Sequence, residues 1–272
     1  MRSFLIELAR LGGKIALEHF QTTGISVSAK GRGDYVSHVD RRVEDALFTR
    51  IAYHHRDDLL LGEETHGHWP SEVEGPCWII DPIDGTTNFL RGLPGWAVSI
   101  CYCDADARPR HAVVFDPLRD EIFVAERGAG LWLNEERVYT SGCKDLGQAI
   151  VSQSMPFRTL DALDDVAAVI HRLQPKIDDM RRSGSAALDC AYVAAGRSDA
   201  YWELGIHPWD VAAGELLIQC GGGKVSDFRG ESGELLGRRS VVAAATPDLH
   251  GQLLAEVGGL ASWLDHPAYR GA

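Results

Sequence analysis

The chain has 272 residues, of which 45% are hydrophobic and 24% charged, as in ordinary globular proteins. Its formal net charge of -12 opposes nucleic acid and anionic membranes over most of the surface, so neither is expected as a direct partner. No apolar run is long enough to cross a bilayer, and charged residues interrupt the N-terminal apolar segment, unlike a signal peptide. The six cysteines form no CxxC pair, which favours reduced thiols and a cytoplasmic location.

The first half of the chain reads as two helices followed by strands. Phe4, Leu8, Leu11 and Ile15 recur at helical spacing, which predicts an amphipathic helix over 3–20. A second helix is predicted at 38–54, and the polar stretch from Thr65 to Pro76 is expected to be a loop. Strands are predicted at 58–61, 77–80, 96–103, 111–115, 121–125 and 149–153, with the apolar alternation typical of a largely antiparallel sheet.

The second half alternates helices and strands. Helices are predicted at 161–173, 185–195 and 209–219, and strands at 177–181, 199–203, 224–226 and 240–245. A change of pattern near 142–148 separates the two halves. We therefore expect an N-terminal α+β subdomain over 1–145 and a C-terminal α/β subdomain over 146–272, joined in one compact unit with a cleft between them.

The segment Trp78–Asn88 carries the densest chemical signal. An apolar strand ends in Asp81, a proline turn follows, and Asp84 precedes a Gly-Thr pair. Two carboxylates at a strand end can face one cation, and hard oxygen ligands favour Mg²⁺ over zinc. The N–H groups of Gly85 and Thr86 would form an anion site if a helix begins there. The alternative is a turn in which the aspartates only cap the backbone.

Two more carboxylates weaken that alternative. Glu63 follows another apolar strand, so it also stands at a sheet edge. Asp210 stands at the start of an apolar helix, where a lone aspartate is usually a helix cap. As members of one set, the two would complete a metal site from both halves of the chain.

Five segments together resemble the inositol monophosphatase family, with the bacterial branch the most similar. They occur in the order and at the spacing of the family: Gly62–Glu64, Trp78–Asn88, Arg181–Ala187, Tyr201–Gly205 and Trp209–Gly222. The resemblance implies an α/β fold, the αβαβα sandwich of the inositol monophosphatase and fructose-1,6-bisphosphatase type. It also implies a homodimeric, lithium-sensitive phosphomonoesterase that acts on inositol monophosphate or a similar small polyol phosphate.

The resemblance also assigns roles to single residues. The metal ligands would be Glu63, Asp81, Asp84, Asp210 and the carbonyl of Ile83. Gly85 and Thr86 would bind phosphate. The residues that contact substrate hydroxyls would be Asp84, Ala186, Glu203 and Asp210. Asp40 corresponds to the carboxylate that hydrogen-bonds Thr86. Glu63, Asp40 and Thr86 are thus the predicted catalytic residues, and two or three Mg²⁺ ions the predicted cofactor.

A charge count supports this assignment. The four side-chain ligands carry four negative charges, which two Mg²⁺ ions would neutralise, leaving the phosphate dianion to be balanced. The Gly85 and Thr86 N–H groups, a third metal or Lys30 could do so. Two metals about 3.5–4 Å apart would support in-line attack by a water, which Glu63 and the Thr86–Asp40 pair would orient and deprotonate.

Two alternatives remain open at the level of sequence. A related phosphatase could act on fructose 1,6-bisphosphate, histidinol phosphate, 3′-phosphoadenosine phosphate or NADP. The chain could instead act mainly by binding protein partners, for example in transcription, alongside an idle or active phosphatase site.

Overall fold

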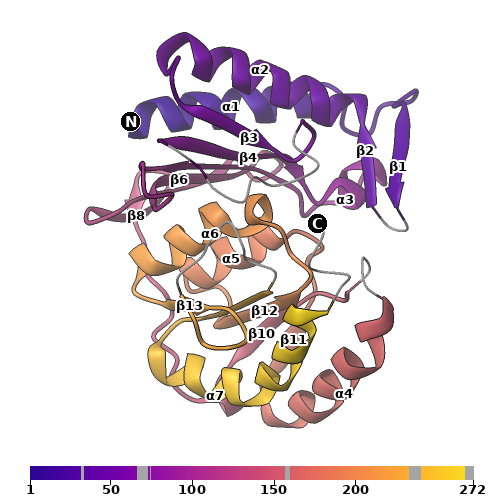
Figure 1. Cartoon of the computed structure of the whole chain (residues 1–272), viewed down its shortest axis with the longest axis vertical. Coiled ribbons are helices and arrows are strands. Elements are labelled where there is room, and N and C mark those ends of the chain that lie inside the picture. The colour runs from indigo at the N-terminus through magenta and orange to yellow at the C-terminus, as the bar shows by residue number, and fades with distance from the viewer. Residues whose placement is uncertain (32–33, 66–72, 74, 157–159, 233–239, 267–272) are drawn as a thin grey trace.

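A computed structural model describes residues 1–31, 34–65, 73, 75–156, 160–232 and 240–266 of the chain. In this part of the chain the helices and sheets stack in five layers, helix–sheet–helix–sheet–helix (Figure 1). The αβαβα sandwich predicted from the sequence is confirmed. The division into subdomains at residue 145 stays a prediction.

The first outer layer consists of α1 (Arg2–Leu17) and α2 (His38–His54). A hairpin of β1 (Val27–Gly31) and β2 (Asp34–Ser37) connects them. Apolar residues of both helices, such as Leu8 and Val43, pack with Ile80 and Val98 on one face of the first sheet. The helical periodicity recognised in the sequence is thus the face that covers this sheet.

The first sheet has the strand order β3-β4-β5-β6-β7-β8-β9. Only β3 and β4 pair in parallel, and the others form an antiparallel meander. The strands are β3 (Leu59–Gly62), β4 (Cys77–Asp84), β5 (Ala97–Cys103), β6 (Pro109–Asp116), β7 (Glu121–Glu126), β8 (Gly130–Leu133) and β9 (Glu136–Arg137). A five-residue helix, α3 (Thr86–Leu90), directly follows β4.

The second sheet has the strand order β11-β10-β12-β14-β13. Its parallel pairs β10–β11 and β10–β12 give the second half its βαβ character, while β12–β14 and β13–β14 are antiparallel. The strands are β10 (Ile150–Gln153), β11 (Asp179–Arg181), β12 (Ala200–Leu204), β13 (Lys224–Ser226) and β14 (Ser240–Ala244).

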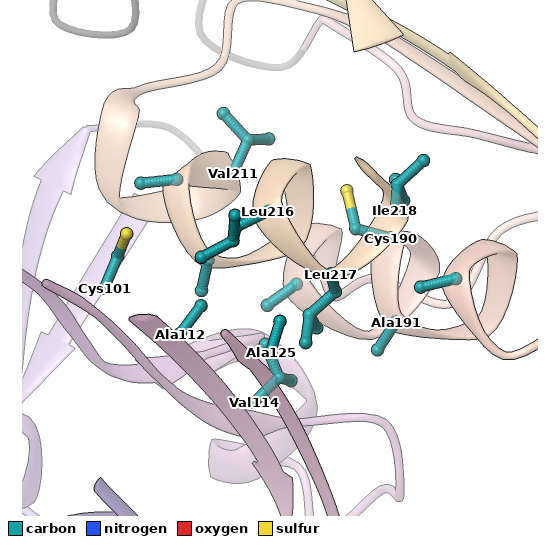
Figure 2. Packing of buried hydrophobic residues seen from close by; sticks show 14 of the residues in the cluster. Cys101, Ala112, Val114, Ala125, Cys190, Ala191, Val211, Leu216, Leu217 and Ile218 are labelled. Atoms are coloured by element: carbon teal, nitrogen blue, oxygen red, sulfur yellow. The ribbon is translucent and has the colours of Figure 1, made fainter. Parts of the chain in front are cut away.

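The middle layer consists of α5 (Ala186–Ala194) and α6 (Pro208–Gly221), which lie between the sheets. Figure 2 shows Leu216 and Leu217 of α6 above Ala112 and Ala125 of the first sheet. The two helices approach closely at Gly214, where an added Cβ would lie 2.3 Å from Cβ of Cys190. The glycine therefore sets the spacing of the helix that carries Asp210.

The last layer consists of α4 (Leu163–Leu173) and α7 (Pro247–Val257), which cover the far face of the second sheet. Short 3₁₀ helices complete the described chain at Leu146–Gln148, Leu160–Ala162, Gln174–Lys176 and Gly258–Asp265. All six cysteines are free thiols. Among the described helices, none combines the length and the hydropathy that a membrane span requires.

Candidate functional site

A cleft of about 400 Å³ opens beside the end of β4. Nearly all of the predicted site residues line it: Glu63, Asp81, Ile83, Asp84, Gly85, Thr86, Ala186, Glu203 and Asp210. Asp40 does not line the cleft; it is fully buried beside it. The residues come from both halves of the chain, as the sequence predicts.

Three aspartates form a compact cluster in this cleft. Each of Asp81, Asp84 and Asp210 offers a carboxylate oxygen, and these oxygens all lie within 4.8 Å of one another. Asp81 and Asp84 come from β4, and Asp210 comes from the first turn of α6. All three are buried, so water offers them little solvation. The donor set, purely carboxylate oxygen, fits a hard divalent cation such as Mg²⁺.

Backbone N–H groups fix the orientation of each carboxylate. The N–H of Ile83 donates to Oδ1 of Asp81 at 3.0 Å. The N–H of Ala187 donates to Oδ2 of Asp84 at 2.8 Å, and the Ser185 hydroxyl donates to the same oxygen. The N–H of His207 donates to Oδ2 of Asp210 at 2.7 Å. The cluster is thus held in place by the chain itself.

The electrostatics of the cluster favour a cation. Burial raises the pKa of Asp81 and of Asp84 well above the ordinary aspartate value. The negative charges of Glu63 and Asp210 raise both pKa values further. A bound cation would reverse this effect, because it would offset the burial and the mutual repulsion of the ionised carboxylates.

The turn after β4 has a conformation that requires glycine. Gly85 has φ +92°, and an added Cβ would lie 2.7 Å from the carbonyl oxygen of Gly95. Asn88, in α3, donates through Nδ2 to the carbonyls of Gly95 at 2.6 Å and Ser183 at 2.9 Å. This amide therefore ties the Asp-Gly-Thr turn to the second half of the chain.

Thr86 connects the cleft to α2. Its hydroxyl lies 3.1 Å from the carbonyl oxygen of Ile83 and 3.4 Å from Oδ1 of Asp40. The backbone N–H and the hydroxyl of Ser37 both donate to Oδ2 of Asp40. Burial, with a smaller contribution from the charge of Glu63, raises the pKa of Asp40 to about 6. The predicted contact between Asp40 and Thr86 is thus present, at the long end of the hydrogen-bond range.

The wall contributed by the second half is also polar. Glu203, in β12, accepts a hydrogen bond from the Tyr201 hydroxyl. Asp189 accepts from Ser183 at 2.8 Å, and burial raises the pKa of Asp189 to about 6. Ala186 stands at the first position of α5. Polyol hydroxyls would find acceptors on this side.

Several lining residues were not predicted from the sequence. They include Tyr35, Asn88, Ser154, Arg182 and Asp189. Asn88 and Arg182 lie within motif segments, and Tyr35 lies in the segment 34–40 that contains Asp40, so these three could have been found there. Nothing in the sequence marks Ser154 and Asp189. The side chain of Lys30, a predicted cation, and the predicted Thr65–Pro76 loop at 66–72 and 74 lie outside the described residues.

The sequence profile of the inositol monophosphatase family matches residues 1–261. The chain belongs to the inositol monophosphatase family. The Nus factor SuhB of Pseudomonas aeruginosa is 42% identical over 251 residues, which are 90% of this chain and 92% of that protein. The resemblance drawn from the five sequence segments is therefore confirmed.

Solved structures agree with this assignment. An IMPase from Thermotoga maritima is 30% identical with a TM-score of 0.85, and the match covers 96% of this chain and 98% of that one. A staphylococcal IMPase-II with bound inositol monophosphate is 26% identical with a TM-score of 0.81, covering 96% and 95%. The family fold thus extends over almost the whole chain.

Proposed function

We propose that this protein is a Mg²⁺-dependent phosphomonoesterase that hydrolyses inositol monophosphate or a similar small polyol phosphate. The observation that carries the proposal is the buried cluster of Asp81, Asp84 and Asp210 within 4.8 Å, on the wall of a 400 Å³ cleft. Glu63 and the carbonyl of Ile83 complete the proposed ligand set. The Gly85–Thr86 turn beside it would receive the phosphoryl group.

Mg²⁺, when bound, supplies Lewis acidity and lowers the pKa of a coordinated water. The side chains of the protein then orient the reactants. Thr86 and Asp40 would position the attacking water and accept its proton, together with Glu63. Glu203 and Asp210 would accept hydrogen bonds from substrate hydroxyls, which fixes the phosphate ester relative to the water.

The substrate class rests on the acceptors in the cleft and on the relatives. Ionised carboxylates are acceptor-only groups that suit a ring rich in hydroxyls and would repel a second phosphate near Glu203. Structures of the staphylococcal relative hold inositol monophosphate and 2′-AMP, and both are monophosphates. A monophosphate is therefore favoured over a bisphosphate such as fructose 1,6-bisphosphate or 3′-phosphoadenosine phosphate.

Phosphate release from a panel of phosphomonoesters tests the proposal. The wild-type protein should release phosphate with Mg²⁺, stop when a chelator is added, and recover when Mg²⁺ is restored. Asp81→Asn and Asp210→Asn should remain folded and be inactive. Full activity in excess chelator, or no turnover of any phosphomonoester, would refute it.

A protein-binding regulatory role is the second candidate, and the name of the 42% identical relative, a Nus factor, favours it. In this role the protein is expected to contact other proteins and not nucleic acid directly, which stays a prediction. The homodimer also stays a prediction. A cell in which Asp81→Asn replaces the wild-type protein separates the roles. A normal phenotype would assign the cellular role of the protein to partner binding, and the phenotype of a deletion would assign that role to catalysis.

A further inference from the structure

Helix α2 carries a second buried carboxylate besides Asp40. Glu44 lies four residues after Asp40, so one face of the helix presents both side chains, about one turn apart. Glu44 is only 1% exposed. A buried carboxylate is costly unless hydrogen bonds compensate for its lost hydration, so its contacts indicate what it does.

The described contacts of Glu44 converge on the turn that follows β3. The backbone N–H of Glu64 donates to Oε2 of Glu44 at 2.9 Å. The hydroxyl of Thr65 donates to Oε1. Both oxygens of one carboxylate therefore hold the two residues after Glu63.

Gly62, the residue before Glu63, packs directly against the carboxylate of Glu44. An added Cβ on Gly62 would lie 2.1 Å from Oε2 of Glu44, so only glycine fits there without a shift. Gly62 pairs with Ile80 of β4, and the N–H of Glu63 donates to the carbonyl of Ile80 at 3.2 Å. The turn is thereby held between Glu44 on one side and the strand that carries Asp81 on the other.

We propose that Glu44 is a positioning residue that fixes Glu63 in the cleft, so that α2 holds both predicted partners of the attacking water. Asp40 would orient the attacking water through Thr86, and Glu44 would orient Glu63 through the turn at residues 62–65. The inference rests on the proposed function, because Glu63 is a ligand only if the site binds a cation. It makes α2 the common support of two proposed catalytic residues, Glu63 in the turn after β3 and Thr86 at the start of α3.

Glu44→Gln tests the inference, with Asp45→Asn as the matched control. The amide of glutamine places a donor or a weaker acceptor against the Glu64 N–H, whereas Asp45 is the exposed neighbour on the same helix. Glu44→Gln should weaken Mn²⁺ binding to the metal-free protein, followed by electron paramagnetic resonance, about 10–100-fold. Half-maximal activation should shift to higher Mg²⁺ by a similar factor, while the control stays at wild-type values.

A size-compensating pair separates positioning from packing. Glu44→Ala leaves a void beside Gly62, and the added methyl of Gly62→Ala partly fills it. The double variant should regain part of the melting temperature lost in Glu44→Ala, yet bind Mn²⁺ as weakly as the single variant. Recovery of both stability and Mn²⁺ affinity would show that Glu44 acts only by packing, and would overturn the inference.

Thr65→Val provides a variant that puts the fold at little risk, since Thr65 is exposed. It removes one donor to Glu44 and should weaken Mn²⁺ binding by a few-fold. Wild-type Mn²⁺ affinity in both Glu44→Gln and Thr65→Val would refute the positioning role. A wild-type protein that binds Mn²⁺ but hydrolyses no phosphomonoester would instead refute the proposed function and leave the role of Glu44 to be decided by the binding data.

Discussion

Thr86 links the buried carboxylate of Asp40 to the cleft through its hydroxyl. We expect Asp40→Asn and Thr86→Ala each to lower kcat by about 10²–10⁴, because the attacking water would lose its orienting pair. Mg²⁺ affinity should change much less, since neither side chain belongs to the proposed ligand set. Steady-state kinetics with a Mg²⁺ titration measure both effects, and a normal kcat would remove the pair from the mechanism.

Substitution of Glu203 tests how the cleft would recognise the hydroxyls of a substrate. Because Tyr201 already donates to it, Glu203 is oriented before substrate arrives. Glu203→Gln should lower kcat/KM for inositol monophosphate, and the loss should correspond to about 1–3 kcal/mol of transition-state stabilisation. Glycerol 2-phosphate, which has fewer hydroxyls, should lose less. Equal losses on both substrates would mean that Glu203 supports the cleft generally.

The sequence marks some site residues and hides others for a physical reason. Asp81 and Asp84 stand out because charged residues at the end of an apolar strand need an explanation. Glu44 is hidden because its neighbours Val43 and Leu47 make the segment look like an ordinary amphipathic helix. Its role depends on contact with Gly62 and Thr65, and contacts between distant segments leave no local pattern.

At the level of elements, the β4–α3 turn depends on the absence of a side chain at residue 85. Gly85→Ala should lower the free energy of unfolding by about 3 kcal/mol, because the positive φ and the contact with the Gly95 carbonyl both oppose a Cβ. Gly128→Ala is the matched control: its φ is +82°, but beyond its two chain neighbours no described residue has an atom within 4 Å of an added Cβ. Denaturant unfolding should show a loss of only about 1 kcal/mol there, and equal losses would contradict the role of the close contact.

Elements were predictable where their hydrophobic pattern was complete. The predicted helix at 38–54 coincides with α2, and the strands at 77–80 and 96–103 lie in β4 and β5. The short strands β1, β2, β8 and β9 were missed, because none of them shows sustained apolar alternation: β1, β2 and β9 carry polar residues, and β8 is the short apolar run Gly130–Leu133. Helix α7 was also missed, although Thr246 and Pro247 form a recognisable start: the Thr246 hydroxyl accepts the Leu249 N–H.

For the whole molecule, a site that joins both halves couples cation binding to stability. A ligand that binds only the folded protein at 100 times its Kd adds about 2.7 kcal/mol to the free energy of unfolding. Saturating Mg²⁺ should therefore raise the melting temperature by about 5–10 °C. Asp81→Asn should lose most of this shift in a thermal melt, and a shift of wild-type size in that variant would place the cation elsewhere.

A buried histidine should limit stability in acid. His250 lies 2.8 Å from the Ser226 hydroxyl, and burial lowers its pKa to about 4. The unfolded chain takes up this proton near pH 6.5, so the unfolded state binds more protons between pH 6.5 and 4 and stability falls as the pH falls through that window. Unfolding free energies of wild type and His250→Gln should diverge by about 2 kcal/mol across it. Parallel pH profiles would show that His250 does not contribute.

The separation of the aspartates along the chain also sets the order in which the site can form. Asp81 and Asp84 leave the ribosome early, whereas Asp210 follows only after residues 85–209 have been made. At ordinary rates of protein synthesis that delay is on the order of ten seconds. During this time the nascent chain carries two aspartates of the cluster without the third, and for most of it also lacks the Ser185 and Ala187 groups that hold Asp84. A cation that needs all three aspartates could therefore bind only late in biosynthesis, after residue 210 of the 272 has been made.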